Sequence, residues 1–211
     1  MTRRLICFDL DGTLIPYTTS SGHLATTLGH AADLVVYENN YAAGKINNRE
    51  VVDFDAKWYK GIALDEISDR LESIQVLHGI AEVVSEVHDR GYHAVIGTVG
   101  WRFVAEWFCR RFGFDDYCGP DLERDETGHF TGLVSRHFDE LDKLSFVRTQ
   151  AERLGILLEQ CVAVGDGRSD IPVFEIVGTS IAVNGTSAAN AAARFQVSTR
   201  DLRDILPFVP A

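Results

Sequence analysis

The chain has 211 residues, 45% of them hydrophobic, which is enough for one substantial core, or for one core with a modest insertion. Its 20 basic and 31 acidic residues give a formal charge of -11, which argues against the basic faces that bind nucleic acid. No apolar run approaches the roughly 20 residues that span a bilayer, and Met1-Thr-Arg-Arg is not followed by the apolar region and cleavage site of a signal peptide.

These bulk properties, with the cysteines, indicate where the protein works. We expect neither nucleic acid nor a membrane among its partners. The four cysteines show no CxxC spacing, and two of them, Cys7 and Cys161, lie in apolar strand-like runs. This usage is typical of reduced core thiols and predicts a cytoplasmic protein, with its oligomeric state left open.

The first predicted element is a short buried strand over residues 5–9, in the stretch LICFDLDGTL. Two acids, Asp9 and Asp11, follow the apolar residues with one residue between them. Burying unpaired charge is costly, so we expect a cation to meet these carboxylates. If the chain stays extended there, both side chains point to the same side, and Gly12 permits the sharp turn that follows.

A mostly helical block follows over residues 17–76, and no strand signal interrupts it. Apolar residues recur in it at helical spacing, with polar starts and glycine stops. The predicted helical stretches cover residues 23–44, 47–61 and 64–74. We interpret this block as a cap inserted between the first strand and the rest of the chain.

From residue 79 onward, predicted strands and helices alternate, which favours a parallel α/β sheet. Strands are expected at 92–97, 161–165 and 180–184, helices at 80–91, 101–113, 139–155, 169–178 and 199–209, and a hairpin over 121–134. The predicted domains are therefore an α/β core of residues 1–16 and 77–211 and a helical cap of residues 17–76.

Polar side chains follow three of the predicted strands. Asp9, Thr98 and Asp166 each come directly after an apolar strand run, and Lys143 lies near the start of a helix. In open α/β sheets the binding crevice lies at the carboxyl ends of the strands, so these residues are expected to meet there. Clustered carboxylates need a cation, and a hard divalent ion with oxygen ligands, which we expect to be Mg²⁺, meets that need.

Such a site suits phosphate chemistry. The metal attracts a phosphate group, and the Thr98 hydroxyl and the Lys143 ammonium suit its remaining oxygens. A carboxylate in line with phosphorus can act as the nucleophile and form an aspartyl-phosphate. A second acid nearby can protonate the leaving alcohol and then activate water.

The ordered set FDLDGTL, Thr98, Lys143 and GDGRSD resembles the four motifs of haloacid dehalogenase (HAD) superfamily phosphatases, between Phe8 and Asp170. The stretch GDGRSDIPVFEIVGTSIAVNG is most similar to the phosphoserine phosphatase-like branch. The resemblance implies a Rossmann-like parallel sheet core of HAD type with an inserted helical cap of the C1 type.

The resemblance also implies roles for the motif residues. Asp9 would be the nucleophile, and Asp11 the general acid/base whose backbone carbonyl also meets the metal. Thr98 and Lys143 would bind the phosphoryl group, with Lys143 also restraining Asp9.

The same resemblance completes the metal site with the late acidic loop. Asp166 would be the third protein ligand, and Asp170 a carboxylate that supports the metal or a water. Asp170 could instead cap the helix that follows it. The expected Mg²⁺ site comprises Asp9, Asp11, Asp166 and Asp170.

Recognition of the substrate departs from the phosphoserine phosphatase pattern. The family has a glutamate nine residues past the nucleophile and a cap arginine, whereas Thr18 and Asp55 stand at those positions here. Phosphoserine is therefore not the expected substrate. The candidate substrate residues are Thr18, Thr19, Ser20, His23, Gly100, Trp101 and Arg102. The stretch PYTTSS could also be only a polar hinge, and Trp101 and Arg102 could serve packing and solvation.

The function that we expect is Mg²⁺-dependent hydrolysis of a small phosphorylated metabolite through an aspartyl-phosphate. Phosphotransfer to an alcohol and mutase action would use the same intermediate and stay open. A receiver-like signalling domain also combines an acidic pocket with a threonine and a lysine, but neither a DxDGT strand end nor an inserted cap is typical of one. A non-catalytic phospho-ligand-binding protein is the other alternative, although Asp9, Asp11 and Lys143 are all present.

Overall fold

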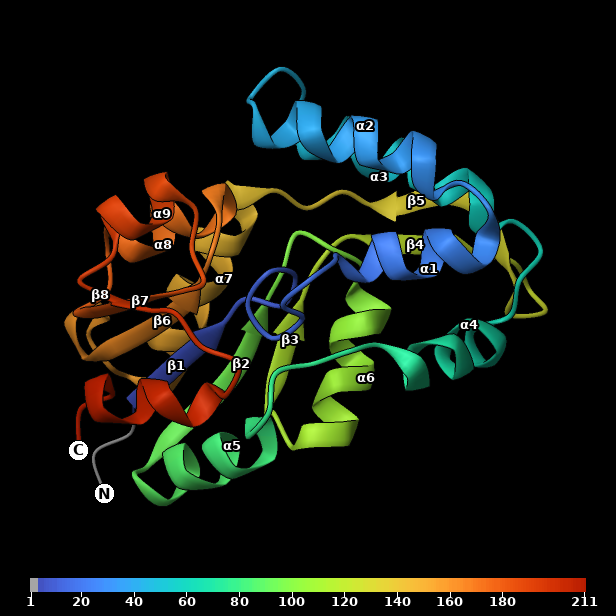
Figure 1. Cartoon of the computed structure of the whole chain (residues 1–211). Coiled ribbons are helices and arrows are strands. Elements are labelled where there is room, and N and C mark those ends of the chain that lie inside the picture. Colours follow the sequence, from blue (N-terminus) through green and yellow to red (C-terminus); the bar gives the residue numbers. More distant parts are fainter. Residues whose placement is uncertain (1–3) are drawn as a thin grey trace.

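The computed structural model describes residues 4–211, and Figure 1 shows their arrangement around one central sheet. Residues 1–3 lie outside the described part of the chain. They belong to the predicted first core segment and begin the stretch that we considered as a signal peptide. All strand pairings in this sheet are parallel, with β1 in the interior. Its strands, in spatial order, are β3 (Asp116–Cys118), β2 (Tyr92–Gly97), β1 (Arg4–Phe8), β6 (Cys161–Gly165), β7 (Thr179–Val183) and β8 (Phe195–Val197). The expected α/β fold is confirmed.

Helices cover both faces of the sheet, because alternate residues of the strands bury opposite faces. In β1, Leu5 and Cys7 belong to one apolar cluster, and Ile6 and Phe8 belong to another. The helices of the first face are α7 (Glu140–Leu154), α8 (Ile171–Phe174) and α9 (Ser187–Ala192), and those of the second are α5 (Ile80–Asp89), α6 (Arg102–Phe112) and the 3-10 helix η5 (Leu202–Phe208). Figure 1 shows α8 and α9 above the sheet and α5 below it. Each face of the sheet therefore forms a hydrophobic core with the helices that cover it.

Four α-helices make up the cap, and they lie beyond the sheet toward the right of Figure 1. They are α1 (Ser20–Leu28), α2 (Ala31–Ala42), α3 (Asn48–Asp55) and α4 (Leu64–Arg70), with short 3-10 helices η1 (Ala56–Tyr59) and η2 (Leu71–Ser73). The expected helical stretch over 23–44 is two helices, because Gly29 adopts φ 88° and ends α1. The start expected at residue 47 is a capping box between Asn47 and Glu50.

A hairpin of β4 (Asp121–Arg124) and β5 (Phe130–Arg136) extends from the core onto the cap. The Gly61 N–H donates to Phe130 O, and the Phe130 ring packs edge-on against Tyr59. The hairpin was expected, but β3, β8 and α9 were not, since they are too short to show a clear period. In the described part of the chain, no helix is both long and apolar enough to cross a membrane.

Candidate active site

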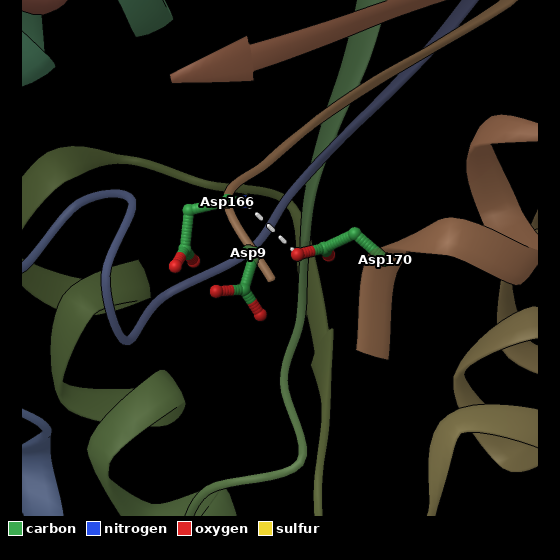
Figure 2. A group of neighbouring side chains, drawn as sticks. All are labelled: Asp9, Asp166 and Asp170. Atoms are coloured by element: carbon green, nitrogen blue, oxygen red, sulfur yellow. Dashed lines mark hydrogen bonds between the residues drawn. The ribbon is translucent and has the colours of Figure 1, made fainter. Parts of the chain in front are cut away.

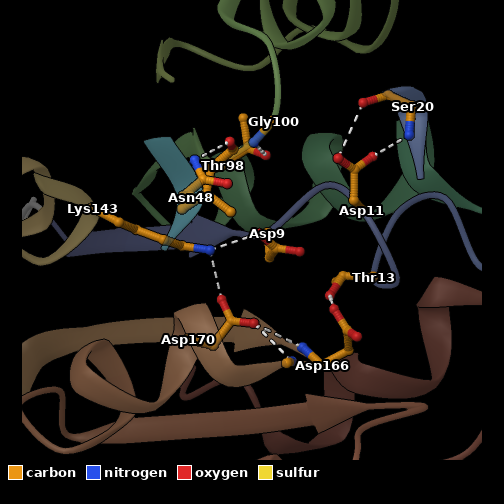
Figure 3. Close-up of polar contacts among 12 residues, drawn as sticks. Asp9, Asp11, Thr13, Ser20, Asn48, Thr98, Gly100, Lys143, Asp166 and Asp170 are labelled. Atoms are coloured by element: carbon orange, nitrogen blue, oxygen red, sulfur yellow. Dashed lines mark hydrogen bonds and ion pairs between the residues drawn. The ribbon is translucent and has the colours of Figure 1, made fainter. Parts of the chain in front are cut away.

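The expected residues meet where three neighbouring strands end (Figure 3). Phe8 at the end of β1 is in register with Ile96 of β2 and Val164 of β6. Asp9, Thr98 and Asp166 are the residues that immediately follow these three strands, so they lie at the same edge of the sheet. The first turn of α7 adds Lys143, and Asp139 caps that helix by accepting from two backbone N–H groups.

Lys143 is the electrostatic centre of this site. Its Nζ lies 2.6 Å from Asp9 Oδ1 and 2.6 Å from Asp170 Oδ1, and all three side chains are almost fully buried. Burial lowers the pKa of Lys143, but the charges of Asp170 and Asp9 outweigh it and leave that pKa well above the usual range. Burial raises the pKa of Asp9, against the opposing effect of Lys143. The lysine is therefore a fixed cation between two acids.

The acids outnumber that single cation. One carboxylate oxygen each from Asp9, Asp166 and Asp170 lies within 4.8 Å of the others (Figure 2). Burial, with the charge of Asp170, raises the pKa of Asp166 to about 7. An all-oxygen donor set with uncompensated negative charge is what hard divalent cations bind. The described residues therefore fit a divalent metal ion.

Asp170 organises the loop after β6 as well as the lysine. Its Oδ2 accepts from the backbone N–H groups of Asp166 and Gly167, both at 3.0 Å, while Oδ1 accepts from Lys143. Gly165 lets this carboxylate approach, since a Cβ at that position would lie 2.2 Å from it. Asp170 thus joins the metal group and also fixes the backbone that carries Asp166.

Asp11 lies apart from the three clustered acids and faces the cap (Figure 3). The backbone N–H and the hydroxyl of Ser20 donate to its two oxygens at 2.6 and 3.0 Å. Burial raises the pKa of Asp11 to about 6, although these hydrogen bonds oppose the shift. Gly100 makes room for the carboxylate, because a Cβ there would lie 2.5 Å from Asp11 Oδ2.

The turn after β2 is stabilised by hydrogen bonds within the turn and by hydrogen bonds from the cap. The Thr98 hydroxyl accepts from the Gly100 N–H at 2.9 Å. Asn48, buried at the start of α3, donates its amide to Val99 O and Phe138 O, both at 2.9 Å. Asn48 was not predicted, because it is one polar residue in a helical block and only the folded cap brings it to this turn.

A cavity of about 540 Å³ opens above the site, between core and cap. Asp9, Asp11, Thr98 and Asp166 line its floor. Of the seven candidate substrate residues, Thr19 and Gly100 line it. Ser20 does not line it but binds Asp11.

The other four candidates lie outside the lining of this cavity. Thr18 is exposed. His23 contacts Arg70 O at 2.9 Å. Trp101 is fully buried and donates its indole N–H to Asp55, and Arg102 stacks on Tyr117. The side chains of His23, Trp101 and Arg102 make contacts within the protein, and the exposed Thr18 does not line the cavity.

Comparison with known proteins gives one family. A family model described as haloacid dehalogenase-like hydrolase matches residues 6–175. A phosphoserine phosphatase of Archaeoglobus fulgidus is 27% identical over 201 residues, or 95% of this chain, which spans 58% of that protein's length. The phosphoserine phosphatase of Methanocaldococcus jannaschii is 26% identical over 208 residues, with 98% of each chain covered.

Solved structures agree with the sequence matches. A phospho-aspartyl intermediate analogue of phosphoserine phosphatase superposes with a TM-score of 0.88 at 26% identity, over 100% of both chains. A substrate-bound phosphoserine phosphatase complex gives a TM-score of 0.88 at 25% identity, again over 100% of both. These matches confirm the resemblance inferred from the motifs and agree with the expected class of enzyme, a phosphatase.

Proposed function

This chain belongs to the haloacid dehalogenase-like hydrolase family, and on that premise we propose that it is a Mg²⁺-dependent phosphatase of a small phosphorylated metabolite. Its similarity to phosphoserine phosphatases in sequence and fold supports the class of reaction. Its substrate is proposed to differ from phosphoserine, since Thr18 is exposed and Asp55 replaces the expected arginine. The cytoplasm is the proposed compartment.

The proposed nucleophile is Asp9. Lys143 binds Oδ1 of Asp9, so attack on phosphorus falls to Oδ2. A bond from Oδ2 to phosphorus forms while the ester bond from phosphorus to the alcohol oxygen breaks, which gives an aspartyl-phosphate. Water then attacks phosphorus, the bond to Oδ2 breaks, and inorganic phosphate leaves.

Asp11 is the proposed proton carrier. A carboxyl group with a pKa raised to about 6 can hold a proton for the departing alcohol and can afterwards accept one from the attacking water. Two hydrogen bonds from Ser20 hold the carboxyl group in place, and Asp11 lines the cavity. This placement supports a role distinct from that of Asp9.

The transferred phosphoryl group needs donors for its oxygens. An ammonium has three N–H bonds, and Lys143 spends two of them on Asp9 and Asp170. The third is available for a phosphoryl oxygen. The Thr98 hydroxyl, which accepts from Gly100, can donate its own proton to another.

Asp9 and Asp166, with the backbone carbonyl of Asp11, are the proposed holders of Mg²⁺, and Asp170 supports the loop. The bound ion would neutralise the clustered carboxylates and polarise the phosphate ester. The chain's own residues then orient the ester and move the proton.

The observation that carries the proposal is the position of Lys143, 2.6 Å from both Asp9 and Asp170 at the meeting point of three strand ends. The DxDGT strand end and the inserted cap are the features that distinguish this chain from a receiver domain. Asp9, Asp11 and Lys143 all lie in the site, which favours catalysis over binding alone.

Hydrolysis of p-nitrophenyl phosphate tests this proposal. We expect turnover with Mg²⁺ and loss of turnover in EDTA. After an acid quench, mass spectrometry should find one phosphoryl group on the peptide that contains Asp9. Asp9→Asn should abolish both signals while the circular dichroism spectrum stays that of the folded protein. Metal-independent turnover, or an active Asp9→Asn variant, would refute the mechanism, and product analysis with added alcohols would reveal phosphotransfer.

A further inference from the structure

The cap side of the cavity is acidic and apolar. Its two carboxylates, Glu38 and Asp55, stand among Val51, Val52 and neutral polar residues. Within residues 4–211, the cap contributes no lysine, arginine or histidine to this lining. A negatively charged group on the far end of a substrate would therefore meet no cation from the cap.

Among residues 4–211, the Glu38 carboxylate on α2 has one hydrogen-bond partner. It accepts from the Thr19 hydroxyl at 2.5 Å, and that hydroxyl also caps α1 by accepting from the Gly22 N–H. No salt bridge reaches Glu38 in the described part of the chain. Burial, then the negative charges of Asp11 and Asp55, raise the pKa of Glu38 to about 7. A cationic group in the cavity would relieve this unfavourable charge.

Asp55 is different, because its oxygens are already occupied. His30 Nε2 lies 2.6 Å from Oδ1, and the Trp101 indole N–H and the Tyr59 hydroxyl donate to Oδ2 at 2.7 and 3.3 Å. Asp55 is only 1% exposed. Asp55 adds negative potential to the cavity, but its oxygens have less remaining capacity to accept hydrogen bonds from a ligand than those of Glu38.

Arg168 is the cation on the core side of the lining, and it is also occupied. Its guanidinium donates to Tyr41 O at 2.7 Å and pairs with Glu140 at 3.2 Å. It therefore joins the acidic loop to the cap. A substrate carboxylate would therefore compete with Glu140 for this guanidinium.

We propose that Glu38 determines specificity by binding an ammonium group, and that the substrates are phosphorylated amino alcohols: phosphomonoesters with a cationic amine and no carboxylate. This inference rests on the proposed phosphatase function. The ester phosphate would occupy the floor at Asp9, the hydrocarbon part would lie along Val51 and Val52, and the ammonium would reach Glu38.

Two esters of nearly equal size isolate the charge. Phosphoethanolamine carries an ammonium group where ethylene glycol monophosphate carries a hydroxyl group. A hydrogen bond to a charged group changes affinity by roughly 10- to 100-fold. We expect kcat/KM with Mg²⁺ to favour phosphoethanolamine by about that ratio, and to favour it over O-phosphoserine. In Glu38→Gln the ratio between the two esters should fall close to one, whereas in Glu66→Gln, an exposed acid of α4, it should stay at the wild-type value.

The failures of the two proposals are distinguishable. Mg²⁺-dependent hydrolysis of p-nitrophenyl phosphate without any preference for phosphoethanolamine would overturn this inference alone. A preference for O-phosphoserine, or a Glu38→Gln ratio equal to that of the wild type, would overturn it as well. Should no ester be hydrolysed, calorimetric titration of the Mg²⁺-loaded protein with both esters decides: equal affinities refute the inference, and tighter binding of phosphoethanolamine supports it.

Discussion

Two buried carboxylates, Asp9 in the core and Asp55 in the cap, are stabilised in opposite ways. Asp9 is 4% exposed and shares one ammonium with Asp170, beside a further acid, Asp166. Asp55 is 1% exposed and receives three donors, from His30, Trp101 and Tyr59. One site has too few cations for its acids, and the other surrounds a single acid with donors.

This difference separates a reactive site from a structural one. Uncompensated acids keep a site ready for a metal ion and for a phosphate, because binding either of them relieves an existing cost. A carboxylate whose hydrogen-bonding capacity is satisfied has little to gain from a ligand, and it fixes the packing around it instead. We therefore expect cations to affect the core acids Asp9, Asp166 and Asp170 but not Asp55 in the cap.

The largest effect is expected for Lys143→Met. This change leaves Asp9 and Asp170 buried without their cation, so activity should fall about 10³-fold. Breaking a buried pair costs about 3–5 kcal/mol of unfolding free energy, and we expect that loss in EDTA and a smaller one with Mg²⁺. Urea unfolding under both conditions measures it, with the exposed Lys45→Met as control. Wild-type stability of Lys143→Met in EDTA would contradict the charge balance described here.

The second effect is stabilisation of the wild type by Mg²⁺. A ligand at 100 times its Kd adds about 2.7 kcal/mol to the unfolding free energy if it binds only the folded state. Asp166→Asn should remove this increment, since it removes one of the three clustered carboxylates. Asp55→Asn should retain it. Urea unfolding with and without Mg²⁺ measures the increment. Its loss in Asp55→Asn would show that Asp55 contributes to Mg²⁺ binding, as Asp166 does.

The third effect lies in the cap. Trp101→Phe removes one donor from Asp55 and should lower the unfolding free energy by about 2 kcal/mol, with the Mg²⁺ increment unchanged. Trp107→Phe in α6 is the matched control, because Trp107 packs on Phe108 and Arg111 rather than on a buried acid. Equal stability of the two variants in urea would mean that the Trp101 hydrogen bond contributes nothing to the cap.

The core acids could be predicted from the sequence because each lies in a short motif at a strand end. Asp9 and Asp166 follow apolar runs whose parallel pairing could be inferred, and parallel strands deliver their ends to one edge. Residues 92–97 and 161–165 are strands with the bounds that we expected. Local sequence patterns were sufficient to predict these acids, because the site lies at the edge of the sheet where the neighbouring parallel strands end.

The cap side of the site could not be predicted in this way. Helical periodicity identifies the apolar face of α2, but not that Glu38 faces a cavity formed by docking of distant segments. Trp101 directly follows Gly100, which lines the cavity, but its own side chain is fully buried and does not line it. Nearness in sequence therefore suggested a substrate contact where the fold buries the indole against Asp55.

Glu38 lies in the cap, as Asp55 does, but its negative charge is not balanced by a cation in the described part of the chain. In this respect it resembles the core acids. Burial, with the negative charges of Asp11 and Asp55, raises its pKa to about 7, while the hydrogen bond from Thr19 opposes the shift. Below that pH the carboxyl group is protonated and cannot pair with an ammonium; above it the group is ionised and can. The kcat/KM ratio of phosphoethanolamine to ethylene glycol monophosphate should thus rise, by up to about tenfold, between about pH 6 and about pH 8. Taking a ratio cancels the titration of Asp11, which acts on both substrates. Glu38→Gln should give a flat ratio, and a wild-type ratio that falls as the pH rises would show that Glu38 does not bind the amine.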